Sequence, residues 1–224
     1  MVVRDAVDVV GASVLHALSL GLERILVLDN GSSDGTRDVL RRLDRHGVPV
    51  AWRSEPGLYM QAELMTGLVH EASREGADWV VPMDADEFLL SPAKLPALLP
   101  QVKRDGVLVP VTNFVQRRDR LEPTPEGLLT MTMRVACTLD AVTSERLLRE
   151  GGIGLVEARW PHKLLLRAST DVRMHAGNHG ADGIGDLEGT DWFELLHAPV
   201  RARSQLLGRV EHAARVRAAR PVGG

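Results

Sequence analysis

The first ninety residues of this 224-residue chain alternate between short apolar runs and segments with helical periodicity. The apolar runs cover residues 1–4, 24–28, 48–52 and 79–83, and the helical segments between them cover residues 7–18, 39–43 and 59–74. Strands and helices that alternate at this spacing predict βαβ units, in which a parallel sheet carries helices on both faces. Pro82 lies inside the fourth run and indicates that this strand ends there.

The rest of the chain, after Pro96, has a less regular pattern. Strand-like runs cover residues 106–114, 128–135, 163–167 and 171–174, and residues 201–217 have helical spacing. Residues 175–191 are rich in glycine, aspartate and histidine, which is typical of a long functional loop. We therefore expect an irregular second half that carries functional residues.

Composition excludes several classes of protein. Apolar residues make up 44% of the chain and charged residues 25%, as in folded globular proteins. Cys137 is the single cysteine, which rules out a disulfide framework or a cysteine-built zinc site, and we interpret it as a buried, inert thiol. No apolar run approaches the roughly 18 residues of a membrane span and no signal peptide precedes the first motif, so we expect a cytoplasmic protein without a transmembrane segment.

Charge is distributed unevenly along the chain. The net charge of −3 gives no reason to expect nucleic acid as a partner. Residues 201–220 nevertheless contain six arginines and a single acidic residue, Glu211. We interpret this basic segment as the solvated face of a terminal amphipathic helix.

Acidic residues follow three of the predicted strands. Asp5 follows the first, Asp29 ends the second, and Asp84 and Asp86 follow the fourth. In an open parallel sheet, ligands bind beyond the carboxyl ends of the strands, so these carboxylates are expected to face one crevice. They would repel one another unless a cation or hydrogen-bond donors compensated them. Because Mg²⁺ usually binds through one or two carboxylates and substrate phosphates, the pattern predicts a metal-bridged phosphate ligand.

Two of these acidic motifs have alternative interpretations. Asp84 and Asp86 point to the same side of an extended backbone, where they could hold a metal and a sugar hydroxyl together, or they could be solvated acids that cap the next helix. Residues 29–36, with the sequence Asp-Asn-Gly-Ser-Ser-Asp-Gly-Thr, could be a turn capped by Ser33 or Asp34. In that same turn, Asp29 could hydrogen-bond a base or a ribose.

Four of the eight histidines fall within one 36-residue stretch, at positions 162, 175, 179 and 197. A neutral imidazole can bind ions such as Mn²⁺, and the first half of the chain supplies oxygen ligands. His179 and His197 are the best candidates because both lie at loop or strand-end positions. The alternative for each is a histidine that is hydrogen-bonded for structural reasons.

Three N-terminal motifs in this order resemble the glycosyltransferase family 2-like group. They are Val3-Arg4-Asp5, residues 29–36, and residues 79–89, which contain the Asp-Ala-Asp-Glu-Phe motif of one branch of that group. Gln61 and the segment 197–205 also resemble the group's pattern. The resemblance is good over residues 1–92, patchy to residue 160, and moderate from 160 to 205. It is fairly specific because the three motifs occur together.

This resemblance implies a GT-A fold: an α/β domain with a Rossmann-like, mostly parallel central sheet flanked by helices and a less regular acceptor-side half. We expect a single domain over 1–224, with a nucleotide-binding half (1–92), an acceptor-side half (93–200) and a C-terminal basic helix and tail (201–224). The implied activity is metal-dependent transfer of a sugar from a UDP- or GDP-sugar to an acceptor hydroxyl. A homo-oligomer is a further possibility.

The resemblance also implies roles for individual residues. Asp5, Asp29, Gln61 and Asp84 would lie by the nucleotide, with Asp84 on the ribose or the metal. Asp86 would ligate Mn²⁺ or Mg²⁺, and His179 or His197 would complete the site. If the reaction inverts the anomeric carbon, a carboxylate must take the acceptor's proton. The candidate bases, which the sequence leaves open, are Glu87, Asp182, Asp186 and Asp191.

One departure keeps other functions open. The family often has glutamate where this chain has Ala6. A catalytically inactive nucleotide-binding or scaffold protein is therefore the main alternative. A metal-dependent phosphatase or a nucleotidyltransferase is less well supported, because neither the Asp-x-Asp position nor the segment 4–8 fits their usual patterns.

Overall fold

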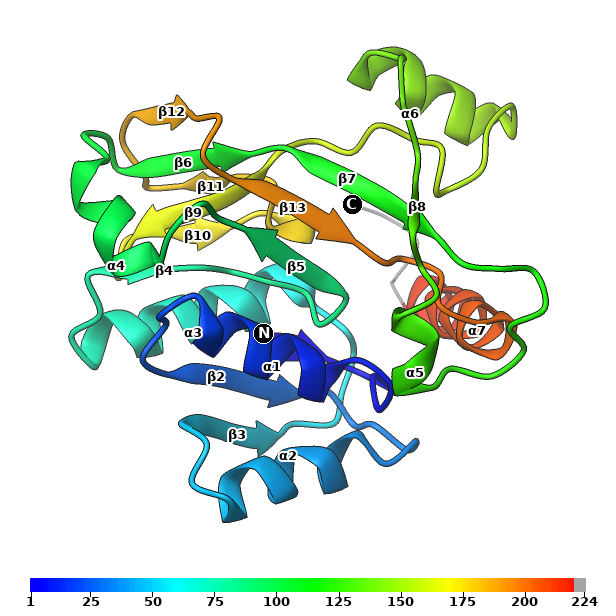
Figure 1. Cartoon of the computed structure of the whole chain (residues 1–224), viewed down its shortest axis with the longest axis horizontal. Helices are drawn as coiled ribbons and strands as arrows, with labels where there is room; N and C mark the ends of the chain where they lie inside the picture. The colour runs from blue at the N-terminus through cyan, green and yellow to red at the C-terminus, as the bar shows by residue number, and fades with distance from the viewer. Residues whose placement is uncertain (220–224) are drawn as a thin grey trace.

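A parallel sheet of three strands forms the start of the chain in the computed structural model, which describes residues 1–219 (Figure 1). Its strand order is β1 (Val2–Val3), β2 (Ile25–Asp29) and β3 (Val50–Ser54). The register pairs Val3 with Asp29 and Asp29 with Ser54, so the three strands end level with one another. The parallel βαβ arrangement expected for the first three strands is confirmed. The expected fourth strand over 79–83 is wrong in length and direction, because only Trp79–Val80 is a strand and it pairs antiparallel with Lys163–Arg167 in another sheet.

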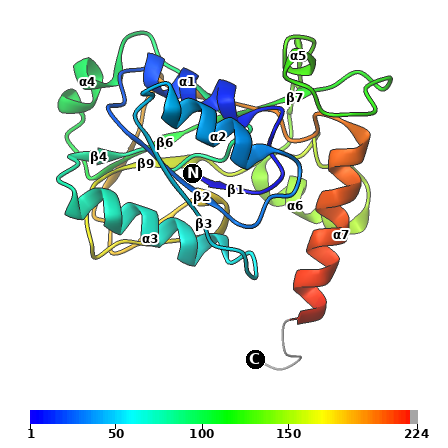
Figure 2. The same cartoon turned by 90° about the horizontal axis from the view of Figure 1, so that it is seen from below.

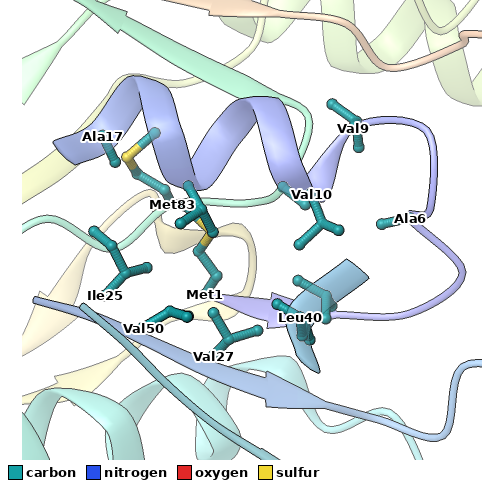
Figure 3. Close-up of a cluster of buried hydrophobic side chains, with 13 residues drawn as sticks. Met1, Ala6, Val9, Val10, Ala17, Ile25, Val27, Leu40, Val50 and Met83 are labelled. Atoms are coloured by element: carbon teal, nitrogen blue, oxygen red, sulfur yellow. The ribbon is translucent and has the colours of Figure 1, made fainter. Parts of the chain in front are cut away.

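Helices cover both faces of these strands. Figure 2 shows α1 (Val10–Ser19) and α2 (Thr36–Arg45) on one side and α3 (Gln61–Arg74) on the other. Successive residues of β2 alternate between the two faces. Ile25 and Val27 join the cluster under α1, whereas Leu28 packs with α3. Figure 3 shows the first of these clusters, which burial of apolar side chains stabilises.

Two further sheets, each of four strands drawn from residues 79–197, contain most of the antiparallel pairs. Their orders are β12-β6-β9-β4 and β5-β13-β7-β8. The strands are β4 (Trp79–Val80), β5 (Glu87–Leu90), β6 (Gly106–Val109), β7 (Val111–Val115), β8 (Met133–Arg134), β9 (Lys163–Arg167), β12 (Leu187–Gly189) and β13 (Glu194–His197). A separate hairpin pairs β10 (Arg173–Met174) with β11 (Ala181–Asp182). The run expected as one strand over 106–114 is divided at Pro110, which has no N–H to donate.

The remaining helical elements lie around these sheets. They are α4 (Leu95–Leu98), the 3₁₀ turn η1 (Leu99–Gln101), α5 (Pro125–Leu128), α6 (Ala141–Glu150), the 3₁₀ turn η2 (Ala176–Asn178) and α7 (Arg203–Ala219). In Figure 2, α7 runs away from the sheets. Helix α7 confirms the helix that the spacing of apolar residues over 201–217 predicts. The last residues of the expected tail, 220–224, lie outside the described residues.

Two expected elements differ from the structure. The strand expected over 128–135 is wrong: residues 125–128 are helical, because Thr124 caps the Gly127 N–H and Pro125 suits the first helical turn. Only Met133–Arg134 is extended there. Residues 175–191, expected as a loop, contain η2 and the short strands β11 and β12. Within residues 1–219, no helix is both long and apolar enough to cross a membrane.

Candidate active site

A cavity of about 810 Å³ lies beyond the carboxyl end of β1, between the N-terminal strands and the start of α7. Its volume is in the range of small-molecule and cofactor sites. Five residues expected in the site from the sequence line this cavity: Asp5, Gln61, Asp84, Asp86 and His197. A second cavity, of about 460 Å³, lies at the amino ends of β2 and β4 and has a mostly apolar lining.

The loop after β1 is tied to the turn after β2. Asp5 adopts a positive φ of 47°, which is uncommon for a residue other than glycine. Its N–H donates to Ser32 Oγ at 2.9 Å, and its Oδ1 accepts from the Ser33 N–H at 2.7 Å. Asp34 accepts hydrogen bonds from the backbone N–H groups of Val7 and Thr36. These bonds hold the half-exposed Asp5 carboxylate at the cavity.

The structure does not bring Asp29 together with the site residues that line the cavity. Its side chain is fully buried and does not line the cavity. The carboxylate accepts from the Ser32 N–H at 3.1 Å and from Ser54 Oγ at 2.7 Å. Asp29 therefore shapes the turn that begins at Asn30, because its oxygens are already used by the neighbouring strand and turn.

Asp84 and Glu87 share a buried lysine. Lys163, at the start of β9, places its Nζ 3.0 Å from Asp84 Oδ2 and 2.6 Å from Glu87 Oε1. Asp84 also accepts from Gln61 Nε2 at 2.8 Å, and its own N–H donates to Glu87 Oε2 at 2.9 Å. Gln61 and Asp84 therefore reach the cavity as a pair, whereas Glu87, expected as a candidate base, is completely buried beneath them.

Two carboxylates beside one lysine leave one negative charge in excess. Burial, and then the Asp84 carboxylate, raise the pKa of Glu87 to about 8, although Lys163 opposes this change. Burial would lower the pKa of Lys163, but Asp84 and Glu87 outweigh it and raise that pKa above its ordinary value. Glu87 thus carries the proton that neutralises the group at neutral pH.

We expect the Glu87 proton to make stability fall as the pH rises. The pKa of Glu87 is higher in the folded protein, about 8, than the ordinary 4.5, so the folded state binds more protons between these values. Its contribution to the free energy of unfolding is complete below about pH 4.5 and is lost by about pH 8, at up to about 1.4 kcal/mol per pH unit. Urea unfolding between pH 5 and 8 should show a shallower decline in Glu87→Gln, whereas the exposed Glu145→Gln keeps the wild-type slope. Parallel slopes in Glu87→Gln and wild type would contradict the assignment.

Asp86 is compensated by two arginines. The Arg201 side chain is 3% exposed. Its Nε donates to Asp8 Oδ2 at 2.5 Å and its Nη2 to Asp8 Oδ1 at 3.1 Å. Its Nη1 donates to Asp86 Oδ2 at 3.1 Å. Arg209 Nη2 donates to the same Asp86 oxygen at 2.5 Å. Burial alone would raise the pKa of Asp86, but Arg209, His197 and Arg201 hold that pKa well below its usual range. Asp86 is therefore ionised.

His197 is held in one tautomer by Asn113, its register partner on β7. The Asn113 amide nitrogen donates to the carbonyls of Val156 at 3.0 Å and Ala158 at 3.2 Å, so its oxygen must face His197 Nδ1, at 2.9 Å. A carbonyl oxygen only accepts, so Nδ1 carries the proton. Burial lowers the pKa of His197, which favours the neutral ring. Its Nε2 then presents a lone pair 3.9 Å from Asp86 Oδ1.

The acids that follow β1 and β4 therefore line one cavity together with His197, the last residue of β13. The sequence model of glycosyl transferase family 2 matches residues 4–155 of this chain. The chain belongs to glycosyl transferase family 2. Its fold is accordingly of the GT-A type, as expected from the sequence, and its function is glycosyltransferase-like. No curated protein matches the chain.

Four other residues expected in the active site of this family 2 protein do not line the cavity. His179 stacks on Trp160 and its Nδ1 contacts the His162 carbonyl oxygen at 3.1 Å. Asp182 is exposed and pairs with His175, and Asp186 is exposed and pairs with Arg104. Asp191 is exposed between β12 and β13. The three aspartates became candidates because residues 175–191 are rich in glycine, aspartate and histidine. The composition of a segment does not show where its side chains lie.

The donor atoms of the family 2 site fit a divalent cation that is shared with a substrate. Asp86 Oδ1 and His197 Nε2 face each other, and Mg²⁺ or Mn²⁺ usually takes its other ligands from phosphate oxygens and water. Among residues 1–219, no group of three or more His, Cys, Asp or Glu side chains is arranged to hold a metal alone. The site therefore fits the metal only when a ligand completes the coordination.

Proposed function

We propose that the protein transfers a sugar from a UDP- or GDP-sugar to an acceptor hydroxyl with the help of Mn²⁺ or Mg²⁺. The observation that carries this proposal is that Asp86 Oδ1 lies 3.9 Å from the Nε2 lone pair of His197 at the edge of a nucleotide-sized cavity. Membership of glycosyl transferase family 2 supports the reaction class.

The cavity residues suggest how a nucleotide sugar would lie. Asp5 and the Gln61–Asp84 pair offer hydrogen-bond acceptors and donors suited to a base and a ribose. Asp86, His197 and Arg209 lie along the same lining and suit a metal-bound diphosphate. When bound, the metal would neutralise charge on the departing diphosphate. Within this proposal, the imidazole nitrogen favours Mn²⁺ over Mg²⁺, because Mg²⁺ prefers oxygen ligands.

For a reaction that inverts the anomeric carbon, we propose Glu122 as the base that takes the acceptor's proton. This exposed carboxylate lines the cavity on the loop before α5, opposite the loop after β1, and accepts a hydrogen bond from Ser204 Oγ at 3.0 Å. Glu87, Asp182, Asp186 and Asp191 do not line that cavity. The acceptor oxygen would form the new glycosidic bond as the sugar–diphosphate bond breaks, and its proton would pass to Glu122.

Glu122→Gln is expected to lower kcat by about 10²-fold or more, because general-base catalysis commonly contributes this much. The KM for the donor should change little, since the substitution leaves the proposed donor contacts in place. Steady-state kinetics measures both constants, and Glu126→Gln, an exposed glutamate of α5, is the matched control. An unchanged kcat in Glu122→Gln would exclude this base.

The proposed activity is tested by incubating the protein with UDP- and GDP-sugars together with a panel of hydroxyl acceptors (sugars, sugar alcohols and water itself) and measuring the release of UDP or GDP as the sugar passes to the acceptor oxygen. We expect release that stops when EDTA is added and resumes with excess Mn²⁺. Nucleotide binding without any release would favour the inactive binding or scaffold protein instead. Neither release nor binding with any donor would contradict the proposed function.

A further inference from the structure

The two arginines on Asp86 differ in their surroundings. Arg201 is buried and also pairs with Asp8, so it is part of the protein's interior. Arg209 lies on α7, lines the cavity and has a side chain that is 46% exposed. Its Nη1 donates to the Pro199 carbonyl oxygen at 2.7 Å, and its Nη2 contacts Asp86 at 2.5 Å. Asp86 therefore has one permanent cationic partner and one that can reach solvent.

A divalent cation on Asp86 would compete with this second partner. The carboxylate already receives two guanidinium groups on one oxygen, and Arg209 has the greatest effect among the charges that lower its pKa. A metal bound to Asp86 and His197 would place two further positive charges beside Arg209. Arg201 would keep Asp86 and the start of α7 in place, because its bonds to Asp8 do not depend on Arg209.

We propose that in the free protein Arg209, on Oδ2 of Asp86, supplies the positive charge that the metal supplies on the Oδ1 side, and that Arg209 leaves Asp86 when the metal and the donor bind. On exchange, the guanidinium leaves Asp86 and binds the diphosphate that arrives with the metal, which suits its planar donors. This inference rests on the proposed nucleotide-sugar donor. The exchange makes the metal and the nucleotide bind cooperatively. By thermodynamic linkage, each ligand raises the affinity of the protein for the other by the same factor.

The exchange predicts opposite effects of one substitution on two ligands. In Arg209→Gln, Mn²⁺ alone should bind at least about fivefold more tightly than in wild type, because its competitor is gone. The same variant should bind UDP or GDP about fivefold or more weakly in the presence of Mn²⁺, because a diphosphate partner is lost. A merely structural role for Arg209 would not improve metal binding.

The experiment measures Mn²⁺ binding by the electron paramagnetic resonance signal of free Mn²⁺, and nucleotide binding by calorimetry. Arg203→Gln is the matched control, since Arg203 is exposed on the same helix and does not line the cavity. Arg209→Lys keeps the positive charge and should bind Mn²⁺ as weakly as wild type. This variant therefore separates the effect of the charge from the effect of the bond between Arg209 and the Pro199 carbonyl oxygen. Urea unfolding of each variant confirms that it is folded at the assay temperature.

Mn²⁺ affinity in Arg209→Gln that is no higher than in wild type would overturn the exchange, even with nucleotide binding intact. Tighter Mn²⁺ binding in that variant, with no binding of UDP or GDP by any form, would support competition at Asp86 and defeat the proposed function. The two failures are therefore distinguishable.

Discussion

Replacement of Asp86 by asparagine is expected to reduce the rate of sugar transfer by about 10³-fold. The pKa of Asp86 is held well below its usual range, so the wild-type side chain is charged at every practical assay pH. Asparagine keeps the size of the side chain and removes the charge that would attract the metal. Loss of one electrostatic contact to a transition state commonly costs about 10²–10³-fold, and a lost metal ligand is expected to reach the upper end.

The measurement is kcat/KM for the donor at increasing Mn²⁺ concentration. Asp38→Asn is the matched control, because Asp38 is an exposed aspartate that pairs with Arg41 on α2. Asparagine is preferable to alanine, which would leave a void between Arg201 and Arg209. A rate in Asp86→Asn within tenfold of wild type at saturating Mn²⁺ would show that Asp86 does not hold the metal.

Replacement of Arg201 by glutamine is expected to lower the free energy of unfolding by about 3–5 kcal/mol. Arg201 joins Asp8 and Asp86, which are 2% and 4% exposed, and its removal leaves a buried carboxylate at Asp8 without its cation. Removal of one partner from a buried ion pair costs this much because the remaining charge is desolvated and unpaired. The same contact joins two parts of the chain that are 193 residues apart.

Urea unfolding monitored by circular dichroism measures this loss. Arg203→Gln makes the same chemical change at an exposed position nearby and is expected to alter stability by less than about 0.5 kcal/mol. If Arg201→Gln does not fold, Arg201→Lys keeps the charge but loses the paired contact with Asp8, and should unfold at a urea concentration below that of wild type. A midpoint equal to that of wild type in either variant would contradict the structural role of Arg201.

The first half of the fold could be predicted because its signals are local. Ile25–Asp29 forms one apolar strand, and the helix over Gln61–Arg74 has its own apolar stripe. The second half depends on contacts between distant segments. For example, β13 (Glu194–His197) pairs with Glu87–Leu90 more than a hundred residues earlier and with Val111–Val115. Helix α6 has a local signal in Asp140, which caps the Thr143 N–H, but Ser144 is the one residue of this helix that is buried, so the helix has few contacts with the core.

The candidate site could be predicted in part for the same reason. Asp5 follows β1 and Asp84 and Asp86 follow β4, and although these two strands belong to different sheets, all three residues line one cavity. Asp29 and Glu87 also lie at strand ends, but their oxygens are used by neighbouring groups inside the protein. The position of an acid in the sequence cannot show whether its carboxylate faces the cavity or bonds to groups inside the protein.

The cations of the site were missed because their partners are distant in sequence. Lys163 contacts Asp84 across 79 residues and Arg209 contacts Asp86 across 123 residues. A lysine at the start of the buried run Lys163–Arg167 was the available signal, since a buried lysine needs a carboxylate partner. A cation or hydrogen-bond donors were expected to compensate the acids, and the structure shows lysine and arginine side chains beside them.

We propose above that the cavity beside Asp86 and His197 binds a nucleoside diphosphate together with a divalent metal. Calorimetric titration of the wild-type protein with UDP and with GDP, each with Mn²⁺ and with EDTA, tests it most directly. We predict binding of at least one nucleotide in Mn²⁺ that is lost in EDTA. Absence of binding by both nucleotides in Mn²⁺, or binding of equal strength in EDTA, would contradict the claim.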